Sequence, residues 1–260
     1  MSEDLLIDVA DGVARLTFNR PAARNAISAA MMDGLADFLL AAETDAGIRC
    51  IVLAGAGGHF MAGGDVRNFA EALEQAPLQR RAAFETRVHR GNRVLSLLQR
   101  VPQPVVASVA GFAAGAGLSF VAAADLAIAA KGARFVLAHV HIGASPDAGA
   151  TYHLPRSIGM KRAKAMALLG DVVDAHAAEA MGLVNRVVAD ADLAAETAVL
   201  ARRLADGPPQ AMARAKALLE ASPGRDLAGQ LAAEAEALGS SAASDEFVAG
   251  VQAFMQKRRA

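Results

Sequence analysis

The stretch that decides the fold is VVASVAGFAAGAGLSFVAAAD, residues 105–125. Its first twenty residues carry no charge, which is close to the roughly 20 apolar residues of a membrane-spanning helix. Most of them, however, are alanine, glycine and serine, which gain little on transfer into lipid, and no basic residue flanks them closely. We therefore predict no membrane span. We expect a short buried strand over residues 105–109, a tight turn over 111–117 and a helix over 118–124.

The small residues of this turn indicate what it can do. Glycine and alanine let another backbone or a ligand approach the main chain closely. The turn also leaves N–H groups without partners at the start of a helix, where the helix dipole is positive. Such an arrangement binds a partial negative charge.

A second stretch has the same plan. GAGGHFMAGGD, residues 55–65, follows an apolar strand predicted over residues 48–54 and opens a helix near Val66. The chain thus builds strand, glycine-rich turn and helix twice. The two turns could each offer one N–H to the same oxygen atom.

The rest of the first 189 residues reads as short strands alternating with helices, which is typical of the α/β class. Alternating apolar residues around Asp11-Gly12 predict a hairpin of strands 5–9 and 13–18. Ser28 is expected to cap a helix that runs to Glu43. A helix is predicted at 78–99, where Phe84 and Val88 belong to an apolar stripe with three- and four-residue spacing. Further helices are predicted up to 158, at 161–169 and from its cap Asp174 to about Gly182. Further strands are predicted at 126–129, 135–137 and 184–188.

From Asp190 the chain is rich in alanine and almost wholly helical. We divide it into a core, residues 1–189, and a helical C-terminal subdomain, residues 190–260. Four helices are expected, with breaks at residues 207–209, residues 222–224 and Gly239. Such a tail covers either this domain or a neighbouring subunit.

Composition excludes several classes of partner. The formal net charge is -1, and the chain has no tryptophan and one tyrosine, so neither a nucleic-acid surface nor a stacking platform is expected. The single Cys50 excludes an internal disulfide and a cysteine-based zinc cluster. The N-terminus lacks the pattern of a signal peptide. We expect a cytoplasmic protein.

Common catalytic motifs are absent. Neither glycine-rich turn continues into the Gly-Lys-Ser/Thr of a phosphate-binding loop, and Ser119 is not in a G-x-S-x-G elbow. His139 and His141 would share one face of an extended segment, but no set of metal ligands with recognisable spacing surrounds them. We expect no metal and regard both histidines as structural or pocket-lining.

Asp147, in the segment SPDAGAT, is the acid of greatest interest. It could cap the helix that follows, as aspartate commonly does. In an otherwise apolar loop it could instead transfer a proton. The residues alone leave both interpretations open.

GAGGHFMAGGD followed by AGFAAGAGLSFVAAADLAIAA resembles the crotonase, or enoyl-CoA hydratase/isomerase, superfamily. The likeness continues through FVLAHVHIGASPDAGATYHLPRSIGMKRAKAMALLG and covers nearly the whole chain. It implies a spiral of ββα units with a helical C-terminal trimerisation region, an acyl-CoA thioester as substrate, and a homotrimer or dimer of trimers. It implies no cofactor, since coenzyme A belongs to the substrate.

Carried over by position, the resemblance makes the N–H groups of Gly64 and Ala116 an oxyanion hole. Coenzyme A would lie along Arg24, Ala26, Ala62, Asp65 and Val66, and Lys257 of a neighbouring subunit could reach its phosphates.

The two glutamates of the family's hydratases are replaced here by Ser119 and His139, whereas Asp147 stands where several isomerases carry their catalytic aspartate. SPDAGATYHLPR is most similar to the 1,2-epoxyphenylacetyl-CoA isomerases. We therefore expect an acyl-CoA isomerase with Asp147 as proton shuttle, and with Ser119 and His139 lining the substrate pocket. The alternatives are a hydratase-like or dehalogenase-like enzyme, or an acyl-CoA binder without activity.

Overall fold

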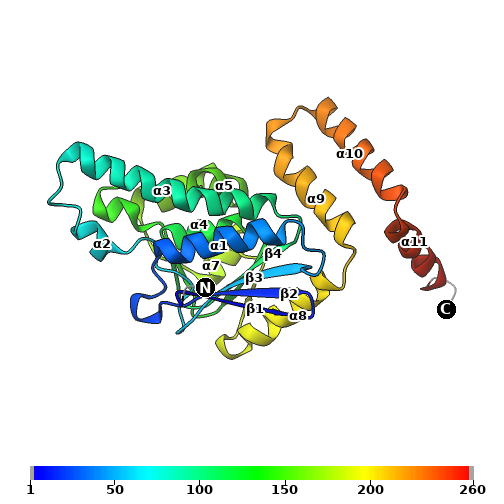
Figure 1. Ribbon diagram of the computed structural model, residues 1–260, viewed down its shortest axis with the longest axis horizontal. Coiled ribbons are helices and arrows are strands. Elements are labelled where there is room, and N and C mark those ends of the chain that lie inside the picture. Colours follow the sequence, from blue (N-terminus) through cyan, green and yellow to red (C-terminus); the bar gives the residue numbers. More distant parts are fainter. Residues whose placement is uncertain (1–2, 258–260) are drawn as a thin grey trace.

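The computed structural model describes residues 3–257 of the protein (Figure 1). A six-stranded sheet has the order β1-β2-β3-β4-β6-β9, and a three-stranded sheet has the order β5-β7-β8. The strands are β1 (Leu5–Ala10), β2 (Val13–Phe18), β3 (Cys50–Gly55), β4 (Val105–Val109), β5 (Phe112–Ala114), β6 (Leu126–Ala130), β7 (Arg134–Val136), β8 (Val173–Asp174) and β9 (Arg186–Val188). The α-helices are α1 (Ala29–Ala42), α2 (Val66–Ala70), α3 (Pro77–Arg100), α4 (Ala116–Ala123), α5 (Ala150–Ile158), α6 (Met160–Leu169), α7 (Ala175–Met181), α8 (Leu193–Ala205), α9 (Pro209–Ala221), α10 (Leu227–Ala242) and α11 (Asp245–Lys257).

The predicted hairpin and helix caps are confirmed. Asp11 and Gly12 have φ of 49° and 76°, the left-handed values that a two-residue hairpin turn needs. The Ser28 hydroxyl accepts a hydrogen bond from the Met31 N–H at the start of α1. The carboxylate of Asp174 does the same for Ala177 at the start of α7.

The deciding stretch forms β4, β5 and α4. Strand β4 has the predicted bounds, whereas β5 lies within the predicted turn and α4 starts two residues earlier than expected. Strand β5 forms because its three residues pair with β7, a partner that no local pattern reveals. No helix in residues 3–257 is long and apolar enough to span a membrane.

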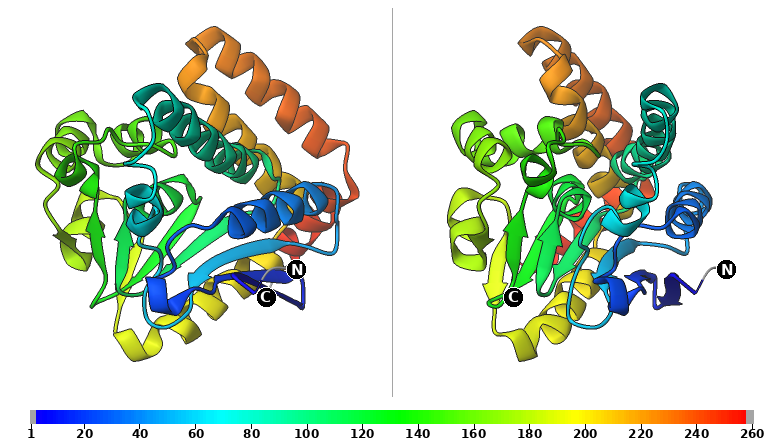
Figure 2. Two further views of the ribbon diagram at one scale, coloured as in Figure 1. Left: turned by 60° about the vertical axis from the view of Figure 1, so that its left-hand side comes forward. Right: turned by 90° about the vertical axis from the view of Figure 1, so that its left-hand side faces the viewer.

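Helices lie on both sides of the six-stranded sheet (Figure 2), and alternate side chains of β3 enter two different apolar layers. Ile51 and Leu53 of β3 belong to the main core with α1, α3 and α4. Cys50 and Val52 point to the other face, where α8 covers them. Burial raises the pKa of the Cys50 thiol to about 12, as suits a core residue.

Helices α9 and α10 pack as an antiparallel pair beside the body, and α11 follows at the far end (Figure 1). The break predicted at Gly239 is wrong, because α10 continues to Ala242. The side chain of Lys216, on α9, ties this arm to the body through the Asp125 carboxylate at 2.8 Å and the carbonyls of Leu98 and Gln103, both at 3.1 Å. Division of the chain at residue 189 stays a prediction.

Candidate active site

The two glycine-rich turns meet in space. Met61 and Ala113 form a parallel β-bridge, in which the Ala114 N–H donates to the Met61 carbonyl at 2.8 Å. A Cβ added to Gly63 would lie 2.7 Å from the Ala114 carbonyl oxygen and 3.2 Å from the Ala116 nitrogen. Only a glycine allows the backbones to come this close.

The contact brings Gly64 and Ala116 to one cavity. Ala116 is the first residue of α4, so its N–H has no partner within the helix. Within residues 3–257, neither its N–H nor that of Gly64 donates a hydrogen bond. The turns therefore present two free donors beside the positive end of a helix.

Two cavities adjoin these residues, one of about 680 Å³ and one of about 370 Å³. Both are bordered by Gly64, Phe69, Phe84, Val88, Asp147 and Ala148. The sequence analysis missed Phe69 altogether and treated Phe84 and Val88 only as the apolar stripe of a helix. Phe84 and Val88 would have the same helical spacing whether they faced the core or a cavity. The apolar pattern therefore could not show that they border a cavity.

Asp147 does not cap a helix. The N-cap of α5 is Gly149, and no side chain accepts a hydrogen bond there. Instead Asp147 Oδ1 lies 3.2 Å from His139 Nε2, and the carboxylate side chain is 36% exposed. Because Ala148 and Gly149 both have positive φ, the backbone turns between Asp147 and the helix. The carboxylate borders both cavities.

Ser119 and His139 take different partners. The fully buried Ser119 donates its hydroxyl to the backbone carbonyl of Asp147 at 3.2 Å. In the described part of the chain no hydrogen bond joins Ser119 to His139, so there is no activated serine nucleophile of the serine–histidine kind.

The prediction that His139 and His141 share one face of an extended segment is wrong. They lie on a 3-10 helix, Ala138–Ile142, and His141 Nε2 faces the Gly170 carbonyl at 2.9 Å. Within residues 3–257, no cluster of three or more histidine, cysteine or acidic side chains could hold a metal.

The residues expected along coenzyme A lie beside the glycine-rich turn of residues 55–65. The Ala62 N–H donates to the Arg24 carbonyl at 2.9 Å, and the Arg24 guanidinium lies 5.9 Å from the centre of the Phe112 ring. Val66 is exposed at the edge of the larger cavity. Lys257 ends α11, but its side chain lies outside the described residues.

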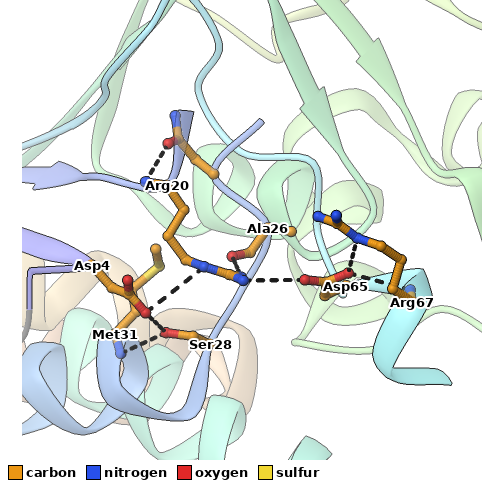
Figure 3. Close-up of polar contacts among 8 residues, drawn as sticks. Asp4, Arg20, Ala26, Ser28, Met31, Asp65 and Arg67 are labelled. Atoms are coloured by element: carbon orange, nitrogen blue, oxygen red, sulfur yellow. Dashed lines mark hydrogen bonds and ion pairs between the residues drawn. The ribbon is translucent and has the colours of Figure 1, made fainter. Parts of the chain in front are cut away.

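Arg20 organises the segments behind this turn, a role that the sequence analysis missed (Figure 3). Its guanidinium donates to the Ala26 carbonyl at 2.6 Å and to Asp65 at 3.2 Å, and it lies 3.8 Å from Asp4. Burial acts to raise the pKa of Asp65, but hydrogen bonds from Arg20 and from Arg67 outweigh it, so the pKa lies below its usual value. Asp65, which follows Gly64, also caps α2.

Known proteins are similar to this chain over nearly its whole length. The model of the enoyl-CoA hydratase/isomerase family matches residues 8–260. The chain belongs to this family. A probable enoyl-CoA hydratase of Rhodobacter capsulatus is 39% identical, over 96% of this chain and 94% of the relative. The 1,2-epoxyphenylacetyl-CoA isomerase of Escherichia coli is 36% identical, over 99% of this chain and 97% of the relative.

The fold prediction is confirmed. The crystal structure of a putative enoyl-CoA hydratase/isomerase from Mycobacterium abscessus superposes with a TM-score of 0.92 at 37% identity, over 97% of this chain and 96% of that one. The chain therefore has the crotonase fold with a helical C-terminal region, and it belongs to a family of acyl-CoA enzymes.

Proposed function

We propose that this enoyl-CoA hydratase/isomerase family member is an acyl-CoA isomerase in which Asp147 moves a proton. The observation that carries the proposal is the position of Asp147. Its carboxylate borders both cavities beside the free N–H groups of Gly64 and Ala116. A double-bond shift needs one base and a stabilised enolate, and this set of groups is suited to both.

In the proposed reaction the thioester oxygen of a 3-enoyl-CoA lies between the two N–H groups. Asp147 removes a proton from C2, the electron pair moves onto the thioester oxygen, and the resulting dienolate is stabilised by the two donors and the α4 dipole. The same carboxyl returns the proton to C4, which leaves the double bond between C2 and C3. Loss of one such donor typically raises the barrier by about 3 kcal/mol. In a rearrangement of a ring epoxide, the same two N–H groups would stabilise the thioester enolate of that substrate.

Coenzyme A would lie along Arg24, Ala26, Ala62, Asp65 and Val66. We propose that the protein is a homotrimer or a dimer of trimers, in which Lys257 of a neighbouring copy reaches the coenzyme A phosphates. The exposed apolar side chains of α10 and α11 support an interface there.

Hydration of a 2-enoyl-CoA is the second candidate, and one observation favours it. The relative from Rhodobacter capsulatus is named a probable enoyl-CoA hydratase. A water molecule between the substrate and the Asp147–His139 pair would serve that reaction. The products separate the two candidates, because hydration of a 2-enoyl-CoA gives a 3-hydroxyacyl-CoA.

Asp147→Asn tests the proposal. We expect the variant to lose isomerisation of 3-hexenoyl-CoA to the 2-enoyl isomer, followed by chromatography of the thioesters, because the amide cannot take the proton. Its free energy of unfolding should stay within about 1 kcal/mol of the wild type, since the side chain caps no helix. Asp171→Asn, a change of an exposed aspartate outside both cavities, is the matched control.

A variant at position 147 that still isomerises the substrate would contradict the proposal. A wild-type protein that hydrates crotonyl-CoA and leaves 3-hexenoyl-CoA unchanged would replace it with the second candidate.

A further inference from the structure

The His139 ring lies between Asp147 and the turn that leads into α4. Its Nε2 is 3.2 Å from Asp147 Oδ1. On the other side, a Cβ added to Gly115 would lie 3.6 Å from His139 Cε1, so the ring packs against the residue that precedes α4. The side chain is 12% exposed and lines the larger cavity. It thus touches both the aspartate and the turn that presents the Ala116 N–H.

The proposed reaction needs Asp147 as a carboxylate, and this requirement assigns the hydrogen of the His139 ring. An ionised carboxylate can only accept, so Nε2 must be the donor to Asp147. The other nitrogen, Nδ1, is buried and has no hydrogen-bond partner within residues 3–257. A buried polar atom without a partner lowers stability, so folding alone does not account for a histidine at this position.

The backbone around His139 is held independently of Asp147. The Ala144 N–H donates to the His139 carbonyl at 3.0 Å, and His141 joins the same 3-10 helix to the Gly170 carbonyl at the end of α6. Ser119 separately holds the backbone carbonyl of Asp147. The ring therefore has a fixed place from which to orient the carboxylate. Oδ2 of that carboxylate makes no hydrogen bond with the described residues.

We propose that His139 is a positioning residue for Asp147. Its Nε2–H holds Oδ1 and turns Oδ2 toward the proton that the substrate gives up. The inference rests on the proposed isomerase function, in which Oδ2 takes that proton. In this role His139 neither contacts the reacting carbon nor transfers a proton itself, and its effect should fall on kcat rather than on KM.

Three substitutions at position 139 separate this role from simple packing. His139→Gln puts an amide N–H near the place of Nε2. His139→Asn reaches only to the place of Nδ1, and His139→Met fills similar volume without any donor. His176→Gln, on the exposed face of α7, makes the same chemical change away from the site.

The measurements are kcat and KM for 3-hexenoyl-CoA, together with thermal unfolding. A misplacement of reacting groups by about 1 Å can cost about a hundredfold in rate. We therefore expect His139→Met and His139→Asn to lower kcat by roughly 10- to 100-fold with little change in KM. His139→Gln should keep a kcat clearly above both, and His176→Gln should match the wild type.

Equal kcat values for wild type and His139→Met would overturn the inference, as would equal losses in the Gln, Asn and Met variants. Either outcome leaves the isomerase function intact, provided that Asp147→Asn is inactive. An active Asp147→Asn variant removes the function itself, whatever the variants at position 139 do.

Discussion

Arg20 borders neither cavity, yet its side chain helps to place a backbone donor of the site. It joins the segment that leads into α1, through the Ala26 carbonyl, to the Asp65 carboxylate that begins α2. Gly64 lies directly before Asp65. In the sequence Arg20 stands in Asn-Arg-Pro after a strand, where the pattern predicts only that the strand ends. Its role depends on a partner 45 residues away, which local patterns do not encode.

Asp65 should make the free energy of unfolding depend on pH at acidic pH. Its folded pKa lies below the usual value, so the ionised form stabilises the fold above the unfolded pKa, and this contribution is lost as pH falls through the folded pKa. Asp65→Asn should lower the free energy of unfolding at pH 7 by about 1–3 kcal/mol. The difference from wild type should shrink below about pH 4.

Urea unfolding between pH 3 and pH 7 measures this difference. Asp37→Asn, on the exposed face of α1, is the control and should run parallel to the wild type. A difference between wild type and Asp65→Asn that stays constant with pH would show that the carboxylate contributes through its shape and not its charge.

At the level of elements, the sequence predicts the pieces of the site better than their contacts. Strand β4, the caps at Ser28 and Asp174 and the long helix α3 follow from local apolar periodicity and capping residues. The β5 strand and the bridge between Met61 and Ala113 do not, because each depends on a partner distant in sequence. Of the two interpretations that the sequence left open for Asp147, the helix cap is excluded for a local reason, because the two residues that follow it have positive φ.

The close packing of α4 on the first glycine turn can be tested at Gly117. A Cβ added there would lie less than 3 Å from the Met61 carbonyl oxygen, which is backbone and cannot swing aside. We expect Gly117→Ala to lower the free energy of unfolding by about 1–3 kcal/mol, the usual effect of overpacking, and to lower kcat by moving Ala116. Chemical denaturation and the isomerase assay measure the two effects.

Gly239→Ala is the matched control for Gly117→Ala. Gly239 lies inside α10 with nothing within 4 Å of the added Cβ. Its replacement should raise the free energy of unfolding by about 0.5–1 kcal/mol through helix propensity. If Gly117→Ala is as stable and active as the wild type, the turn and α4 are not held by this contact.

At the scale of the whole molecule, the C-terminal arm carries an unusual amount of exposed apolar surface. Leu227, Leu231 and Leu238 of α10 are all exposed, as are Val248 and Val251 of α11. Large apolar patches on a protein surface mark interaction sites. We therefore expect this face of the arm to be buried between copies of the chain.

Leu231→Glu tests the interface, because a carboxylate buried between subunits without a partner would oppose association. Light scattering after size exclusion should give the mass of three or six chains for the wild type and a smaller mass for the variant. Leu168→Glu, which changes an exposed leucine on α6, is the control. A monomeric wild type, or a variant that keeps the wild-type mass, would contradict the assignment of this face.

The ammonium group of Lys216 affects how far the protein can fold while the chain is still being synthesised. It supplies the cation for Asp125, 91 residues earlier, directly beside the strand and helix that present Ala116. Helix α8, also made late, covers the apolar face of β3 and β4. A growing chain that has not yet reached these residues leaves a carboxylate without its cation and a sheet open to water. Residues late in the chain thus support the strand and helix of the site, and a premature stop before Lys216 would remove more than the arm.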